Sequence, residues 1–152
     1  MAIGSKFDTV TLAEINTQLK TPMAPPFPVI LVVDDEPVIA DTLAAILRQQ
    51  NYAAFTAYDA ASALDLANLI PPHLLISDVV MPGMSGVELA IAMRKNVPDC
   101  KVLLFSGQAR SLDLLAGARA AGHDFTLLDK PIHPAELLAH ISSLQIEQES
   151  VA

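Results

Sequence analysis

Short apolar segments alternate with amphipathic ones from residue 28 onward, and this alternation predicts the fold. Five apolar runs are too short for helices and rich in branched or aromatic residues, so each predicts a buried strand. They are Val29–Val33, Tyr52–Ala57, Leu74–Ile76, Val102–Phe105 and Phe125–Leu128. Helix-start residues follow each run, so helices are expected to begin near Pro37, after Asp59, after Ser85, after Ser111 (ending near Gly122) and at Pro134. Five strands alternating with five helices predict an α/β fold, a doubly wound parallel sheet covered on both faces.

Residues 1–27 have a different pattern. Thr11 and Glu14 have the spacing of a capping box, and apolar residues at helical spacing follow, which predicts one short helix. The prolines from Pro22 to Pro28 interrupt any helix and favour an extended tether. Two interpretations stay open: a loosely ordered extension, or a docking helix for a partner or a second subunit. We therefore divide the chain into an extension (1–27), a domain (28–147) and a C-terminal tail (148–152).

Composition narrows the function classes. The 152 residues point to one domain, and 9 basic against 17 acidic residues leave a formal charge of −8. Such a charge disfavours nucleic acid and anionic membranes as partners. The longest uncharged run has 13 residues, four of them proline, whereas a spanning helix needs about 20 apolar residues. The single cysteine, Cys100, cannot form an internal disulfide, so we expect a cytoplasmic protein. From the charge and the absence of a spanning segment in the sequence, we expect no nucleic-acid or membrane partner.

Residues that carry chemistry stand within two positions of the ends of four of the five predicted strands. Asp34 and Asp35 follow the first strand, Asp78 the third, Ser106 the fourth and Lys130 the fifth. In a parallel α/β sheet, ligands bind beyond the carboxyl ends of the strands. Three carboxylates, one hydroxyl and one ammonium are therefore expected at one edge of the sheet.

Few kinds of functional site combine three carboxylates, one hydroxyl and one ammonium group. Crowded carboxylates repel one another unless a cation joins them, and carboxylate oxygens suit a hard cation such as Mg²⁺. A carboxylate can also act as a nucleophile that forms an aspartyl-phosphate, which a metal and a lysine would stabilise. Each residue alone could be a helix cap, a turn former or a solvated side chain. Together they predict a site that holds a phosphoryl group on or beside a carboxylate.

Four segments resemble the receiver domain of bacterial two-component response regulators, in particular stand-alone, chemotaxis-regulator-like receivers. They are the sequences VILVVDDEP at 29–37, LISDVVMPGMSG at 75–86, LLFSG at 103–107 and the pair KP at 130–131. The double acid, the Asp-x-x-Met-Pro segment, the Ser-Gly pair and the Lys-Pro pair arrive in that family's order and spacing, and the resemblance covers about residues 28–147. It implies a flavodoxin-like sheet with strand order 2-1-3-4-5.

The resemblance also assigns roles at the acidic site. Asp78 would be the phosphoacceptor. Asp35 would ligate Mg²⁺ directly and Asp34 mainly through water, and the backbone carbonyl of Val80 would complete the protein's share of the metal ligands.

Two further residues would contact the phosphoryl group itself. Lys130 would pair with it, and Ser106 would donate a hydrogen bond to it in the active state. In most receivers an aromatic residue stands three places before the lysine and moves with the hydroxyl, but here Leu127 occupies that place. Phe125 lies two residues earlier, on the same predicted strand face, and is either a substitute or a plain core residue.

The resemblance implies a switch that takes its phosphoryl group from a histidine kinase or a histidine phosphotransfer protein. Such a protein catalyses only its own phosphorylation and dephosphorylation. Because the chain ends soon after the fifth helix, we expect a stand-alone regulator that signals by binding a still unidentified downstream protein when phosphorylated. One alternative is a phosphorelay shuttle that passes the group to a histidine. Another is a small Mg²⁺-dependent aspartyl-phosphate phosphatase, although such hydrolases commonly carry Asp-x-Asp, and the adjacent pair Asp34-Asp35 does not match.

Overall fold

The computed structural model describes residues 27–146, so the predicted N-terminal helix and the tail 148–152 lie outside the described residues. The strands are β1 (Val29–Val33), β2 (Ala53–Ala57), β3 (Leu74–Asp78), β4 (Lys101–Ser106) and β5 (Thr126–Asp129). The helices are α3 (Pro37–Gln49), α4 (Ala60–Leu69), α5 (Gly86–Asn96), α6 (Arg110–Ala120) and α7 (Pro134–Ser143). The predicted alternation of strands and helices is confirmed.

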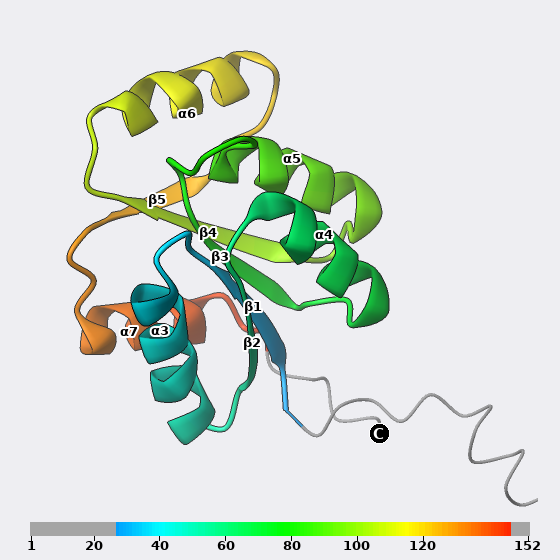
Figure 1. The fold of residues 1–152 in the computed structure, drawn as a ribbon, viewed down its shortest axis with the longest axis vertical. Helices are drawn as coiled ribbons and strands as arrows, with labels where there is room; N and C mark the ends of the chain where they lie inside the picture. Colours follow the sequence, from blue (N-terminus) through cyan, green and yellow to red (C-terminus); the bar gives the residue numbers. More distant parts are fainter. Residues whose placement is uncertain (1–26, 147–152) are drawn as a thin grey trace, which may run out of the picture.

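The five strands form one parallel sheet in the order β2-β1-β3-β4-β5, which confirms the doubly wound, flavodoxin-like prediction. Helices α3 and α7 cover one face, and α4, α5 and α6 cover the other (Figure 1). Because every strand runs the same way, all carboxyl ends lie at one edge of the sheet.

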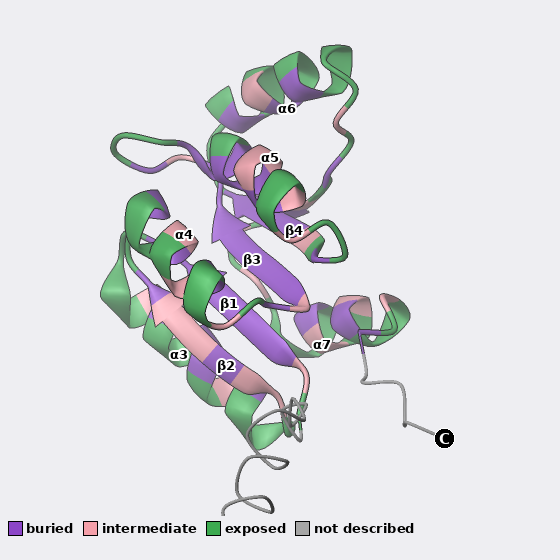
Figure 2. Ribbon diagram, turned by 90° about the vertical axis from the view of Figure 1, so that its right-hand side faces the viewer, coloured by how far each residue is buried: buried purple, intermediate pink, exposed green. Residues whose placement is uncertain are grey.

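Burial of both faces explains why the strands are continuous apolar runs rather than alternating ones. All five residues of β1 are buried: Leu31 and Val33 pack on the side of α4–α6, and Ile30 and Val32 pack on the side of α3 and α7. Figure 2 shows the central strands β1 and β3 as buried, whereas the edge strand β2 is only partly so. Among residues 27–146, no helix has the length and apolar character needed to cross a membrane.

Several element boundaries differ from the sequence prediction. The prediction that the fourth helix follows Ser111 is wrong, because α6 begins at Arg110 with Ala109 as its N-cap and Ser111 is buried inside its first turn. Strand β5 begins one residue after Phe125, and β3 continues to Asp78, whose register partner on β4 is Phe105. The predicted stop near Gly122 is confirmed, since this residue follows α6 with a φ of +92°.

Candidate functional site

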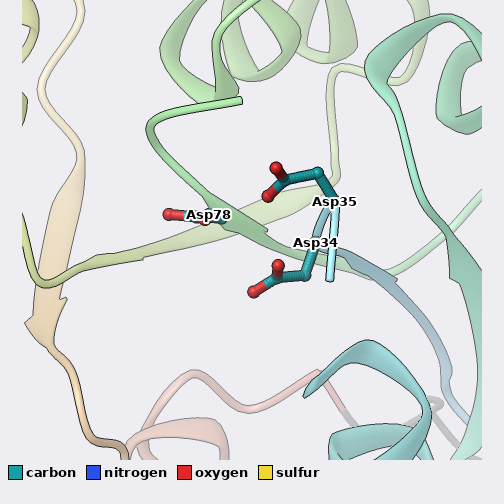
Figure 3. A group of neighbouring side chains, drawn as sticks. All are labelled: Asp34, Asp35 and Asp78. Carbon is teal, nitrogen blue, oxygen red and sulfur yellow. The ribbon is translucent and has the colours of Figure 1, made fainter. Parts of the chain in front are cut away.

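The structure brings the predicted site residues to the carboxyl edge of the sheet. Asp34 and Asp35 follow β1 directly, Asp78 and Ser106 are the last residues of β3 and β4, and Lys130 follows β5. One oxygen from each of the three aspartates lies within 4.8 Å of the others. Figure 3 shows their side chains leaving two strand ends and pointing to the same side.

The two adjacent aspartates have different environments. Asp34 is fully buried, and its Oδ1 accepts a hydrogen bond of 2.8 Å from the backbone N–H of Glu36. Asp35, the next residue, is exposed to solvent. Asp34 is therefore fixed by the protein, whereas Asp35 is open to a ligand from outside.

Lys130 connects the ends of β1 and β3. Its Nζ lies 3.2 Å from Asp34 Oδ2 and 3.2 Å from Asp78 Oδ2. Burial lowers the pKa of Lys130, but attraction to Asp78 and Asp34 and the hydrogen bonds to both outweigh burial, so its pKa is raised above the usual value. The ammonium group is thus charged and offsets part of the negative charge of the two most buried carboxylates.

The Asp78 carboxylate has a raised pKa. Burial is the largest cause, the attraction of Lys130 opposes it, and the repulsion from Asp34 adds to it. The backbone N–H of Val80, two residues further on, donates a hydrogen bond to the carboxylate, which acts to lower the pKa. Three carboxylates against one ammonium leave two negative charges without a cation, so oxygen ligands and charge together fit a divalent metal ion such as Mg²⁺.

The backbone of Asp78 is held by neighbours that sequence reasoning did not single out. The hydroxyl of Ser77 donates to the Asp78 carbonyl at 2.9 Å, and the N–H of Gly86 donates to the Val79 carbonyl at 2.8 Å. A Cβ atom at Gly86 would lie 1.9 Å from the Asp78 carbonyl oxygen, so only glycine fits there. The available sequence signal was a glycine at the first position of a helix, where it is a poor helix former.

The Ser106 hydroxyl has hydrogen-bond partners on the segment that follows β4. Its Oγ accepts a hydrogen bond from the N–H of Gln108 at 3.1 Å and one from the hydroxyl of Ser111. Among the described residues, Ser106 makes no hydrogen bond with Asp78. Ser111 was interpreted only as a helix-start residue, so its contact with Ser106 was missed.

Phe125 lies at the other end of β5 from Lys130. It is buried on the same side of the sheet as Leu127, which is half-buried. The guanidinium carbon of Arg94 lies 4.2 Å from the centre of the Phe125 ring. The ring of His123 is stacked on the Phe125 ring, with 6.1 Å between the two ring centres. Of the two interpretations of Phe125, this environment favours a core residue.

Comparison with known proteins assigns the family. A model of the response regulator receiver domain matches residues 30–142, which is most of the chain. The chain belongs to the response regulator receiver family. A solved receiver domain, described as CheY-like, from Methanospirillum hungatei is 30% identical, with a TM-score of 0.71, over 78% of this chain and 93% of that one. The response regulator TrrA from Thermotoga maritima, solved in complex with Mg²⁺ and BeF, is 31% identical, with a TM-score of 0.67, over 78% of this chain and 99% of that one.

Two curated relatives are longer than this receiver. The probable transcriptional regulatory protein TcrX of Mycobacterium tuberculosis is 34% identical over 115 residues, which are 76% of this chain and 48% of TcrX. The DNA-binding response regulator MtrA of Mycolicibacterium smegmatis is 29% identical over 112 residues, 74% of this chain and 48% of MtrA. The chain therefore spans about half the length of these relatives. They give no support to the expectation that it has no nucleic-acid partner, which stays a prediction.

Proposed function

We propose that this receiver accepts a phosphoryl group on Asp78 from a histidine kinase or a histidine phosphotransfer protein, with Mg²⁺ as cofactor. The observation that carries the proposal is the group of three carboxylates at one edge of the sheet, two of which are paired with Lys130. A carboxylate oxygen of Asp78 attacks phosphorus as the bond to the donor's imidazole nitrogen breaks, and the imidazole keeps the bonding electron pair.

The neighbours of Asp78 have separate tasks in this transfer. Asp35 would bind Mg²⁺ directly, Asp34 mainly through water, and Val80 through its backbone carbonyl. The metal ion would neutralise charge on the phosphoryl oxygens. Lys130, already 3.2 Å from Asp78 Oδ2, pairs with the phosphoryl group once it is attached, and Ser106 donates a hydrogen bond to it.

The surface beside Lys130 supports docking of a helical donor. A cavity of about 530 Å³ lies between α3 and the segment that joins β5 to α7, and it is lined mainly by apolar side chains, with Thr42 and Lys130. Val38 at the start of α3 is 78% exposed. An amphipathic helix that carries the donor histidine would cover this apolar surface while its histidine faces Asp78.

The output we propose is phosphorylation-dependent binding of a downstream protein. We place the receiver in the cytoplasm, where kinases that use ATP act, and we expect it to catalyse only its own phosphorylation and dephosphorylation. Stoichiometry separates this switch from a phosphatase: the switch takes up one phosphoryl group per chain from a small acyl phosphate, whereas a phosphatase turns over substrate many times.

Intact-mass measurement after incubation with acetyl phosphate and Mg²⁺ tests the assignment of Asp78. The wild type should gain one phosphoryl mass, and Asp78→Asn should gain none, because an amide is a poor nucleophile. Asp65→Asn, which changes an exposed carboxylate on α4, should behave like the wild type. A phosphoryl mass on Asp78→Asn would show that Asp78 is not the acceptor.

A further inference from the structure

The edge strand β2 has an outer side on which backbone groups point away from the sheet (Figure 2). Its inner side pairs with β1, and there the N–H of Ala53 donates to the Pro28 carbonyl at 2.9 Å. Successive residues of a paired strand alternate in direction, so the N–H and C=O groups of Ala54 and Thr56 point outward. Such a row of outward groups is a template for pairing with another strand.

The sequence of β2 contains none of the features that usually protect a sheet edge, which are charged side chains, proline and bulges. The strand has the sequence AAFTA and pairs with β1 in unbroken register over its whole length. The other edge strand, β5, ends in Asp129 and is followed by Lys130 and Pro131. Any protection of β2 therefore comes from outside the strand.

The Arg48 side chain, in the last turn of α3, contacts this outer edge. Its Nε and Nη2 donate hydrogen bonds of 3.0 and 2.8 Å to the Ala54 carbonyl oxygen. A carbonyl oxygen has two lone pairs, so these two donors use all of its accepting capacity. A strand that approached β2 from outside would find this acceptor occupied.

The outward groups of β2 match those of a second copy in an antiparallel arrangement. With the two Phe55 residues opposite each other, Ala54 of each copy would lie opposite Thr56 of the other, and each such pair would exchange both N–H···O bonds. Half of the hydrogen bonds between the strands would then use the Ala54 oxygens that Arg48 occupies. The arrangement has a two-fold axis, as most protein dimers do.

We propose that Arg48 keeps the outer edge of β2 closed to pairing with β2 of a second copy of this chain. Pairing would require each copy to break its Arg48–Ala54 hydrogen bonds, which have a charged donor and are stronger than bonds between neutral groups. The proposal is independent of the function proposed for Asp78, because β2 contributes no residue to the acidic group.

Sedimentation velocity over a range of protein concentrations tests the proposal, because it measures the dissociation constant of a dimer. Arg48→Met keeps an unbranched stem but removes the donors, so it should dimerise at least about tenfold more tightly than the wild type. Lys95→Met removes a positive charge from the last turn of α5 and should associate like the wild type. Both variants carry one negative charge more than the wild type, so the comparison removes the effect of net charge.

Amide hydrogen exchange locates the contact. In Arg48→Met, the N–H groups of Ala54 and Thr56 should exchange more slowly as concentration rises, because pairing protects them. Adding Thr56→Pro removes an outward donor and should return the dissociation constant to the wild-type value. Arg48→Gln repeats the test, with the same expected result, should Arg48→Met not fold.

Four results would overturn the proposal. They are an unchanged dissociation constant without the Arg48 guanidinium, an equal gain in Lys95→Met, a gain that persists with Thr56→Pro, and dimers in which the amides of Ala54 and Thr56 stay unprotected.

Discussion

Gly86 offers a test of how the fold positions the phosphoacceptor. It is the first residue of α5, and a Cβ atom there would lie 1.9 Å from the carbonyl oxygen of Asp78, 2.8 Å from its carbonyl carbon and 3.0 Å from Ser77 Oγ. The nearest neighbours are backbone atoms at the end of β3, which cannot turn aside as a flexible side chain can. In Gly86→Ala, either α5 or the backbone of Asp78 must move.

Two opposing effects set the size of the change. Overpacking costs about 1–3 kcal/mol, and replacing glycine by alanine in a helix recovers up to about 1 kcal/mol. We expect a net loss of about 1–2 kcal/mol, or roughly 2–8 °C in melting temperature for a domain of this size. Because the displaced atoms belong to Asp78, phosphorylation by acetyl phosphate should slow at least about tenfold, since small misplacements of a reacting group have large effects on rate.

Gly117→Ala is the matched control. Gly117 is exposed within α6, and a Cβ atom there meets nothing within 4 Å. This variant should gain about 0.5–1 kcal/mol from helix propensity alone, so its melting temperature should rise while its phosphorylation rate stays that of the wild type. Thermal-shift curves and intact-mass time courses decide the matter: if both alanine variants are stabilised and phosphorylated normally, the close contact does not position Asp78.

Further predictions concern charge and burial. At a tenfold excess over its dissociation constant, Mg²⁺ should raise the melting temperature by roughly 3–6 °C in the wild type and much less in Asp35→Asn; equal thermal shifts would remove Asp35 from the metal site. Without metal, Lys130→Met should lose about 1–3 kcal/mol in urea unfolding, because Asp34 is left buried without its cation, and unchanged stability would contradict this. In metal-free protein, an NMR titration should give Asp78 a pKa above the usual value for an aspartate. The folded state then binds a proton on Asp78 more tightly than the unfolded state does. The contribution of Asp78 to the free energy of unfolding therefore increases as pH falls through the folded pKa. Burial raises the pKa of the Cys100 thiol to about 12, so at pH 8 thiol reagents should label Cys100 only as fast as the protein opens.

The position of the site could be predicted from the sequence because the order of strands and helices determines where the strand ends lie in a parallel sheet. The residue that follows each buried apolar run stands at the carboxyl end of a strand, and parallel strands bring all such ends to one edge. Asp34, Asp78, Ser106 and Lys130 could therefore be grouped although they are far apart in the chain. The combination of carboxylates, a hydroxyl and an ammonium group at that edge then indicated a site that holds a phosphoryl group.

Contacts that depend on how closely two elements approach could not be predicted in this way. The need for glycine at position 86 follows from the distance between α5 and the end of β3, which no spacing rule contains. Ser111 has the residue type and position typical of a helix start, so its pattern indicated a cap, whereas the structure uses its hydroxyl to bind Ser106. Both residues act on the site from helices, and the pattern of strand ends says nothing about them.

The environments of Lys130 and Ser106 bear on the energetics of the switch. Each of the two groups proposed to contact the phosphoryl group already has a partner within the chain: Lys130 is paired with Asp34 and Asp78, and Ser106 with Ser111. Phosphorylation would therefore exchange the partners of Lys130, whereas Ser106 accepts both of its hydrogen bonds and keeps its own O–H free to donate. A variant that weakens one of the Lys130 ion pairs should therefore shift the balance between the two states by up to the free energy that this pair contributes to the unphosphorylated state.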